Sequence, residues 1–263
     1  MSIVKKKSTA RLSTLDSIRG ITLCSMIIYH FCWDLAYIVG MDMPWYSSVY
    51  SYIWQQSICW TFILLSGFCA GLSSHNIRRG LIVFGCGIII SLVTYFVTPE
   101  SIVLFGILTF MGSAMIITGL TKRLLLKINA LAGAIIAFAL FLMFRDVNTG
   151  FLGFERIHIL QVNTAPYKNL FTAYLGFPAR NFYSSDYFSI LPWIFLYFTG
   201  FYIFHVLKSG PLDNTKGALF DRSSFHISIT VFDQMGRHSL PIYMLHQVVL
   251  YGISTLIIAL QNR

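Results

Sequence analysis

The feature that most constrains this chain is its first long apolar segment, residues 15–39, which carries charged side chains inside a hydrophobic run. About 20 mostly apolar residues suffice for a helix to cross a bilayer, so this segment is long enough to span one. Ionisable groups inside a membrane cost free energy, and they usually mark a functional site where they have partners. The ionisable side chains here are Asp16, Arg19, His30 and Asp34.

A helix brings these side chains to one face in two pairs. At about 100° per residue, the steps from Arg19 to His30 return the side chain to within about 20° of the same face. Asp16 and Arg19 are three residues apart and therefore adjacent on the helix surface. His30 and Asp34 are four apart and adjacent for the same reason. The sequence thus predicts one acid–base pair where the helix begins and a second pair roughly 16 Å deeper.

The composition indicates an integral membrane protein. Of the 263 residues, 56% are hydrophobic and 11% are charged, whereas soluble domains have about 25% charged residues. A net charge of +9 would suggest nucleic acid in a soluble protein, but in a membrane protein it follows from the basic cytoplasmic segments. We therefore expect a lipid bilayer and no nucleic acid as a partner. The five cysteines lie in apolar segments without a CxxC pair, which favours buried thiols over disulfides or zinc ligands.

Six further apolar segments predict an all-α integral membrane protein with a bundle of about seven transmembrane helices. The expected segments are residues 15–39, 47–74, 80–97, 101–120, 128–144, 187–207 and 238–260. Residues 1–12 form a basic tail, residues 208–237 form a polar loop, and residues 145–186 form a polar connection of a length that is usually functional or disordered. Within this connection, residues 167–177 are expected in the membrane interface. Without an internal repeat or a composition break, residues 1–263 are expected to form a single domain.

The distribution of Lys and Arg predicts the orientation of the bundle. With a cytoplasmic N-terminus and seven crossings, fourteen of the nineteen Lys and Arg residues lie on the inner side and five on the outer side. Such an excess of basic residues is typical of cytoplasmic segments. We therefore expect a multi-pass protein of the cell (inner) membrane with an external C-terminus and an extracytoplasmic connection 145–186.

Two histidines from opposite ends of the chain are candidates for one cavity. His30 lies roughly 21 Å and His246 roughly 12 Å from the inner ends of their helices, and Tyr243 precedes His246 by about one turn. A neutral His oriented by a carboxylate is a good general base, and Asp34 would accept the hydrogen of one His30 nitrogen. A structural hydrogen bond between helices is the alternative for each histidine. A metal held by His30, Asp34 and His246 has no other support, so no metal is expected.

The polar pair at the start of the first segment also has structural interpretations. Residues 13–16, STLD, resemble a capping box, in which Asp16 would serve the helix terminus. Arg19 could extend its charged end to the headgroups. Both structural interpretations are alternatives to a role of Asp16 and Arg19 in a functional site.

Several short motifs, in order along the chain, resemble one family of membrane enzymes. Arg19, ten residues and His30 match the R-x10-H signature of the large transmembrane acyltransferase superfamily. Further motifs resemble its heparan-α-glucosaminide N-acetyltransferase-like catalytic-domain branch: LDSIRG, SGF at 66–68, FGIL at 105–108, DYFSILPW at 186–193 and SLPIYMLHQ at 239–247. The resemblance covers nearly the whole chain. In the family pattern His follows FGIL, whereas Thr109 follows it in this chain. This difference is consistent with a different acceptor or with lost activity.

The resemblance implies an acyl-CoA-dependent (acetyl)transferase of the EC 2.3.1 type. It would move an acetyl or acyl group from cytoplasmic acyl-CoA, with acetyl-CoA as co-substrate, to an extracytoplasmic acceptor, a sugar amine or hydroxyl of a glycan or glycolipid. His30 and Asp34 would be catalytic, with His30 acting as a general base or forming an acyl-histidine. The residues expected to bind substrate or acyl-CoA are Asp16, Arg19, Trp33, Arg78, Asp186, Trp193, Tyr243 and His246.

Two other classes of function fit an intramembrane Asp and His. Proton-coupled transporters of small solutes also use such residues, although an odd number of crossings without repeats differs from the paired repeats of many carriers. A non-catalytic membrane subunit that has kept the fold is the other alternative, and Thr109 gives it some weight. The sequence leaves open the acceptor, the acyl chain and the oligomeric state, for which a homodimer is one option.

Overall fold

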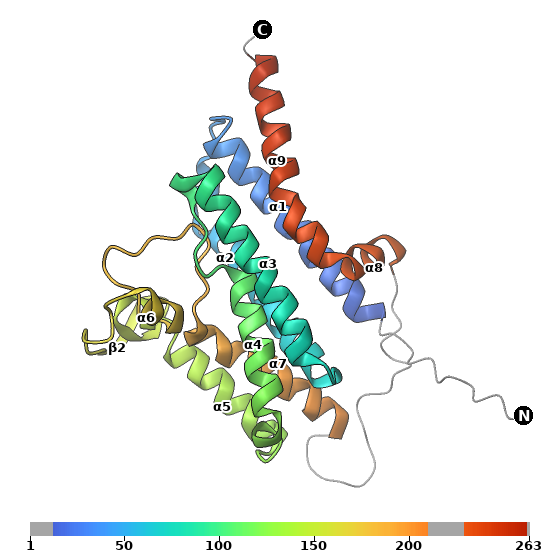
Figure 1. Cartoon of the computed structure of the whole chain (residues 1–263), viewed down its shortest axis with the longest axis vertical. Helices are drawn as coiled ribbons and strands as arrows, with labels where there is room; N and C mark the ends of the chain where they lie inside the picture. Colours follow the sequence, from blue (N-terminus) through green and yellow to red (C-terminus); the bar gives the residue numbers. More distant parts are fainter. Residues whose placement is uncertain (1–12, 210–228, 262–263) are drawn as a thin grey trace, which may run out of the picture. The chain divides into compact units, whose positions relative to one another are not determined.

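The computed structural model describes residues 13–209 and 229–261, and this part of the chain is mainly helical (Figure 1). The predicted basic tail, residues 1–12, lies outside the described residues. The α-helices are α1 (Ser13–Tyr37), α2 (Val49–Leu72), α3 (Asn76–Val97), α4 (Ile107–Leu125), α5 (Ala130–Met143), α6 (Leu170–Leu175), α7 (Ile190–Ser209), α8 (Thr230–Arg237) and α9 (Ser239–Gln261). The other described elements are the 3-10 turns η1 (Pro44–Ser47), η2 (Pro99–Ser101) and η3 (Val147–Thr149) and the strands β1 (Phe151–Phe154) and β2 (Ile157–Gln161).

The long helices coincide with the predicted apolar segments. The largest difference is in α4, which begins at Ile107 instead of residue 101 because Pro99 opens a 3-10 turn and Gly106 precedes the helix. Five described stretches are long and apolar enough to cross a membrane, which is consistent with a multi-pass, all-α membrane protein. They are Val49–Leu72, Asn76–Val97, Ala130–Thr149, Ile190–Lys208 and Ser239–Gln261. Crossings by α1 and α4, and the cytoplasmic N-terminus, remain predictions.

The described residues form two compact units, and each is described by itself. The first unit lies within residues 1–58 and 220–263 and contains α1, η1, the beginning of α2, α8 and α9. In this unit α1 packs against both α8 and α9. Figure 1 shows α9 running beside α1, with α8 at the beginning of α1.

Two glycines allow α1 and α8 to meet backbone to backbone. A Cβ on Gly20 would lie 2.0 Å from the carbonyl oxygen of Phe232. A Cβ on Gly236 would lie 1.9 Å from the carbonyl oxygen of Asp16. Any larger side chain at either position would push the two helices apart.

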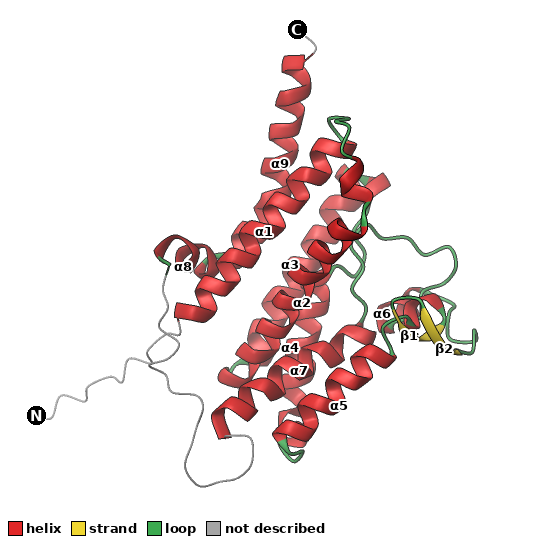
Figure 2. Ribbon diagram, turned by 180° about the vertical axis from the view of Figure 1, so that it is seen from behind, coloured by secondary structure: helices red, strands yellow, loops and turns green. Residues whose placement is uncertain are grey.

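The second unit, residues 59–219, contains the rest of α2 and the elements from α3 to α7. In it α3 pairs with α4, and α5 pairs with α7 (Figure 2). Its core consists of large aromatic side chains without exposed surface, which are Phe110, Phe141, Tyr197 and Phe201. These residues come from α4, α5 and α7, and α4 also packs against α7.

The predicted polar connection 145–186 contains folded elements that the sequence analysis did not predict. Strands β1 and β2 form an antiparallel hairpin, and α6 begins with a capping box between Asn169 and Thr172. The Asn148 amide donates hydrogen bonds to the carbonyl oxygen of Gly176 at 2.8 Å and to Oγ of Ser189 at 2.9 Å. The connection is therefore tied to the residues that lead into α7.

The last polar connection, residues 208–237, also contains a helix. Its central part, residues 210–228, lies outside the described residues. The prediction of a loop up to residue 237 is wrong at its end, where α8 forms and buries Asp233 and Gly236.

Candidate functional site

Two histidines from opposite ends of the chain lie side by side in the first unit. The ring centroids of His30 on α1 and His246 on α9 are 5.1 Å apart, and the ring planes are inclined by 59°. The two helices pack along each other, and both histidines are partly buried between them. The structure thus brings together the two residues that the sequence analysis assigned to one cavity.

A hydrogen bond determines which nitrogen of His246 is basic. Its Nδ1 lies 2.5 Å from the carbonyl oxygen of Tyr243, and because a carbonyl oxygen only accepts, Nδ1 carries the hydrogen. Nε2 therefore keeps its lone pair, and it is buried without a hydrogen-bond partner among the described residues. The ring of Tyr243 itself lies 5.3 Å from that of His246.

Asp34 is completely buried, and its partner differs from the expected one. Its Oδ1 accepts a hydrogen bond of 2.9 Å from Nε2 of Gln247 on α9. The expected hydrogen bond from His30 does not occur among the described contacts of Asp34. Side chains four residues apart lie one above the other on the same helix face, so both reach the facing helix, where α9 supplies an amide. Gln247 was missed as a site residue, although a polar side chain in an apolar span is a signal for one.

Aromatic rings flank the histidine pair. The ring of Tyr29 lies 6.1 Å from that of His30 and 5.2 Å from that of Trp54. Trp33 is 36% exposed, and its ring lies 5.3 Å from that of Tyr37. Trp33 and Tyr37 both lie on α1, and Tyr37 follows Trp33 by about one turn.

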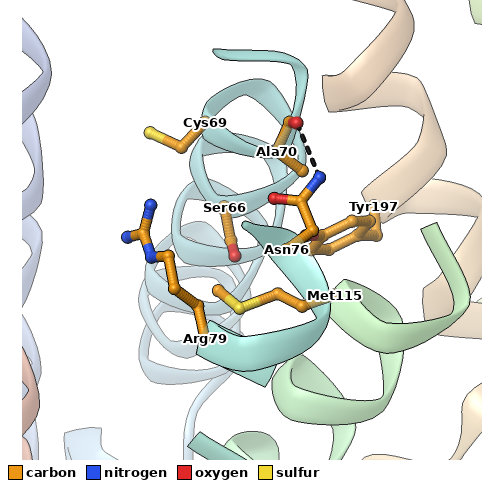
Figure 3. A pocket seen from close by; sticks show the side chains of 7 residues that line it. All are labelled: Ser66, Cys69, Ala70, Asn76, Arg79, Met115 and Tyr197. Carbon is orange, nitrogen blue, oxygen red and sulfur yellow. Dashed lines mark hydrogen bonds between the residues drawn. The ribbon is translucent and has the colours of Figure 1, made fainter. Parts of the chain in front are cut away.

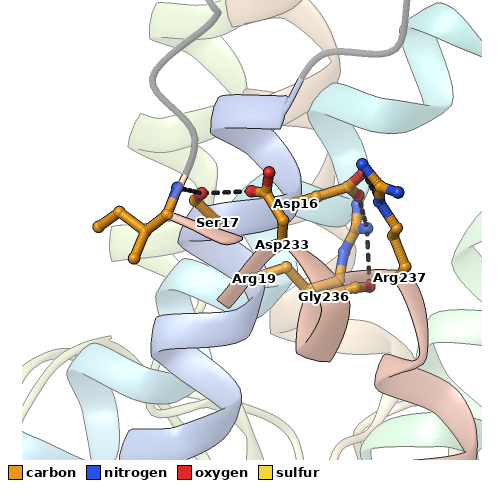
Figure 4. A network of polar contacts seen from close by, with 7 residues as sticks. Asp16, Ser17, Arg19, Asp233, Gly236 and Arg237 are labelled. Carbon is orange, nitrogen blue, oxygen red and sulfur yellow. Dashed lines mark hydrogen bonds and ion pairs between the residues drawn. The ribbon is translucent and has the colours of Figure 1, made fainter. Parts of the chain in front are cut away.

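Asp16 and Arg19 belong to a polar network that joins α1 to α8 (Figure 4). Nη1 of Arg19 lies 2.9 Å from Oδ1 of Asp16 and donates to the carbonyl oxygen of Gly236 at 3.4 Å. Beside them, Oγ of Ser17 donates to the buried carboxylate of Asp233. These contacts favour the structural interpretation of the pair, since both charged groups have partners within the fold.

In the second unit, Asp186 lies at the N-terminus of α4. Its Oδ2 accepts a hydrogen bond of 3.1 Å from the backbone N–H of Ile107, the first residue of α4. Burial raises the pKa of the Asp186 carboxyl to about 6, and the hydrogen bond from Ile107 opposes this shift. A Cβ on Gly106 would lie 2.8 Å from the same oxygen, so the glycine leaves room for the carboxyl group.

Trp193 is buried in α7, and a cation covers its ring. The guanidinium carbon of Arg145 lies 4.8 Å from the ring centroid, a distance typical of a cation–π contact. Nε of Arg145 also lies 3.2 Å from Oε1 of Glu155. The predicted site residue Trp193 therefore takes part in a packed arrangement that holds the residues after α5.

Arg78 lines an open groove where α3 begins. The groove has a volume of about 390 Å³, and it is bordered by residues 73–78, Leu81, Gly119 and Lys122. Nζ of Lys122 donates to the carbonyl oxygen of Ser73 at 3.0 Å, so this side chain crosses the turn between α2 and α3. The groove combines room for a ligand group with two basic side chains, Arg78 and Lys122.

A smaller cavity of about 10 Å³ is also bordered by Asn76 (Figure 3). Its wall includes Ser66 of α2 and Tyr197 of α7, whose hydroxyl oxygens are buried without a hydrogen-bond partner among the described residues. Figure 3 shows Arg79 and Met115 on its other sides. A polar cavity of this size has room for about one water molecule, so we expect it to hold water and no substrate.

Thr109, at the position where the resemblance predicts a histidine, is packed against α3. A Cβ on Gly87 would lie 2.5 Å from Oγ1 of Thr109, and the carbonyl oxygen of Thr109 accepts a hydrogen bond from Ser113. A histidine at residue 109 would need space that the backbone of α3 occupies. The threonine therefore accompanies a close approach of α3 and α4.

No group of three or more His, Cys, Asp or Glu side chains that could hold a metal ion occurs within residues 13–209 and 229–261. His30, Asp34 and His246 accordingly do not form such a group.

One protein-family model matches the chain over residues 11–248, and it is described as heparan-alpha-glucosaminide N-acetyltransferase, catalytic. The matched region begins just before α1 and ends within α9, so it includes both histidines of the pair. No curated protein and no solved structure matches the chain.

Proposed function

The chain belongs to the heparan-alpha-glucosaminide N-acetyltransferase catalytic-domain family of membrane acetyltransferases, and on this premise we propose that it transfers an acetyl or acyl group across the cell membrane. The donor is cytoplasmic acyl-CoA, with acetyl-CoA as the co-substrate. The acceptor is an extracytoplasmic sugar amine or hydroxyl, carried by a glycan or a glycolipid.

The contact between His30 and His246 is the observation that carries this proposal. Two imidazoles 5.1 Å apart, in helices at the two ends of the chain, form a site able to accept and return a proton. In the proposed reaction, His30 takes the proton of the acceptor N–H or O–H as that atom attacks the thioester carbonyl carbon. The C–S bond then breaks, and the CoA thiolate takes the proton from His30. The site ends each cycle in its starting protonation state.

Three further residues are proposed to hold the two imidazoles in place for this reaction, namely His246 itself, Asp34 and Gln247. The bond from Nδ1 of His246 to Tyr243 turns Nε2 into a fixed acceptor beside His30. The hydrogen bond between Asp34 and Gln247 connects α1 to α9 about one turn beyond His30, so it holds the two histidines at their separation. Asp34 is thus proposed as a positioning residue, in place of the direct orienting role expected from its spacing to His30.

The basic groove at the start of α3 is proposed to bind the phosphate groups of the donor. Coenzyme A carries phosphates, and Lys and Arg bind phosphate by charge-assisted hydrogen bonds. Arg78 and Lys122 supply such charges in a groove of about 390 Å³. Arg78→Gln is then expected to raise the KM for acetyl-CoA and to change kcat little, because a phosphate contact is the same in the ground state and the transition state.

The test is acetyl transfer by the purified protein in proteoliposomes, with acetyl-CoA as donor and glucosamine as the first acceptor. His30→Ala is expected to lower the transfer rate by about 10²- to 10⁴-fold, the usual contribution of a general base. His238→Ala is the matched control, because His238 is an exposed histidine between α8 and α9. An unchanged thermal unfolding midpoint shows that both variants fold.

Three outcomes would contradict the proposal. Transfer by His30→Ala at the wild-type rate would remove the histidine from the mechanism. A wild-type protein that acetyl-CoA does not stabilise, but that a small solute does, would instead act as a carrier. A protein that releases no CoA with any sugar amine or hydroxyl tested would be a non-catalytic member of the family.

A further inference from the structure

Large apolar side chains are exposed on β2 and α6, outside the membrane-spanning stretches. We call this set the interfacial patch, and its members are Ile157 (71% exposed), Ile159 (74%), Leu160 (62%), Leu170 (58%) and Phe171 (68%). Exposed side chains of this size are ordinary on a helix that faces lipid. On a hairpin and a short helix they indicate a surface that something covers.

The patch is held close to the ends of two spanning stretches. The hairpin starts a few residues after α5, and the side chain of Asp146 accepts a hydrogen bond of 2.8 Å from the backbone N–H of Arg156. Tyr167 donates to the carbonyl oxygen of Val147 at 2.6 Å, and Asn148 ties the end of α6 to the residues before α7. Figures 1 and 2 both show β2 and α6 at the end of α5. The patch therefore lies where the chain leaves the hydrocarbon core of the bilayer.

The exposed charged side chains of the connection that carries the patch are positive. The acidic side chains of this connection are partly buried, and all three have partners: Asp146 beside Arg156, Glu155 on Arg145, and Asp186 on α4. The exposed ions of the connection are cations, namely Arg156, Lys168 and Arg180. Exposed apolar side chains beside Lys and Arg are typical of segments that lie in the headgroup region of a membrane with anionic lipids.

We propose that β2 and α6 form an interfacial anchor, in which the interfacial patch enters the headgroup region of the adjacent leaflet and the three cations contact lipid phosphates. A bilayer fits better than a second copy of the chain for two reasons. The spanning stretches already fix a lipid surface at this level. In addition, the cations would repel the same cations of another copy.

The test measures the depth of labels on the full chain in lipid nanodiscs. Ile159→Cys and Phe171→Cys are labelled with a charged thiol-reactive spin label, and the unsubstituted chain, whose five cysteines are partly buried, gives the background. Ala165→Cys is the matched control, because Ala165 is exposed between β2 and α6 and belongs to no regular element. Labels at 159 and 171 are expected to collide several-fold more often with oxygen than with a water-soluble nickel complex, and the label at 165 is expected to show the reverse.

Three results would overturn the anchor. Labels at 159 and 171 that match the label at 165 would place the patch in water. Dipolar broadening at 159 that disappears on dilution with unlabelled chain would assign the patch to a second copy. Equal label depth in anionic and neutral nanodiscs for the chain that keeps Arg156 and Lys168 would remove the role of the cations. In anionic nanodiscs, the double variant Arg156→Gln, Lys168→Gln is expected to hold the labels less deeply than the chain that keeps both cations.

Discussion

At the scale of single residues, the hydrogen bond between Asp34 and Gln247 is expected to contribute measurably to the free energy of unfolding. Gln247→Leu would leave a completely buried carboxyl group without its donor, which costs about 1–3 kcal/mol of unfolding free energy. Denaturant unfolding in detergent micelles measures this loss. Gln261→Leu, at the exposed end of α9, is the control and should change little. Equal stability of both variants would mean that Gln247 does not hold α9 against α1.

A second prediction at this scale concerns the pH dependence of stability, because Asp186 has a pKa of about 6 in the folded chain. In the unfolded chain an Asp titrates near 3.9. Between these values the folded state binds one proton more than the unfolded state, so this residue's contribution to stability falls as the pH rises through about 6.

The measurement is the thermal unfolding midpoint between pH 4.5 and 7.5. Asp186→Asn should remove the part of the slope that ends near pH 6, because an amide keeps an acceptor for the N–H of Ile107 and does not titrate. If the unfolding midpoint of the wild-type protein and that of Asp186→Asn change equally with pH, this result would contradict the raised pKa of Asp186.

The site residues show how far sequence reasoning reaches at this scale. His30 and His246 could be paired because polar residues are rare in apolar segments and each had few alternatives as a partner. The partner of Asp34 could not be chosen, because helix spacing says which side chains share a face but not which facing residue they meet. Gln247 was identified as the donor to Asp34 only when α9 was placed beside α1.

At the scale of elements, the contact between α1 and α8 depends on glycine. Gly236→Ala would place a Cβ 1.9 Å from the carbonyl oxygen of Asp16, and overpacking of this kind costs about 1–3 kcal/mol. Gly252→Ala on α9 is the matched control, since nothing lies within 4 Å of its Cβ position. There, helix propensity should make alanine neutral or stabilising by about 0.5–1 kcal/mol.

Thermal unfolding of both variants checks this prediction. A Gly236→Ala chain as stable as the Gly252→Ala chain would show that α8 packs less closely on α1 than described.

The same scale separates the elements that the sequence predicted from those it missed. Long apolar runs predict the long helices for two reasons. Each run is long enough to cross a bilayer, and only a helix satisfies the backbone hydrogen bonds of such a single segment in lipid. The strand β2 was missed because all five of its residues are exposed, so no alternation of buried and exposed positions marks it. The helix α8 has only eight residues, and two of its buried positions are Asp and Gly, which an apolar pattern does not include.

At the scale of the whole molecule, the charge distribution predicts an odd number of crossings. Reporter fusions before residue 1 and after residue 263 test this, with a periplasm-active enzyme and a cytoplasm-active fluorescent protein at each end. We expect cytoplasmic activity at the N-terminus and periplasmic activity at the C-terminus, because seven crossings leave fourteen of the nineteen basic residues inside. Both ends on one side would mean that α1 or α4 does not cross.

The carbonyl group of Tyr243 has a consequence for inhibitor chemistry. The hydrogen bond from Nδ1 to this carbonyl group fixes the tautomer of His246. A 180° flip of the imidazole ring would break this hydrogen bond, so Nδ1 remains the donor and Nε2 remains the acceptor. A compound designed for this place should therefore present a hydrogen-bond donor toward Nε2, and an otherwise identical compound with an acceptor there should bind less tightly.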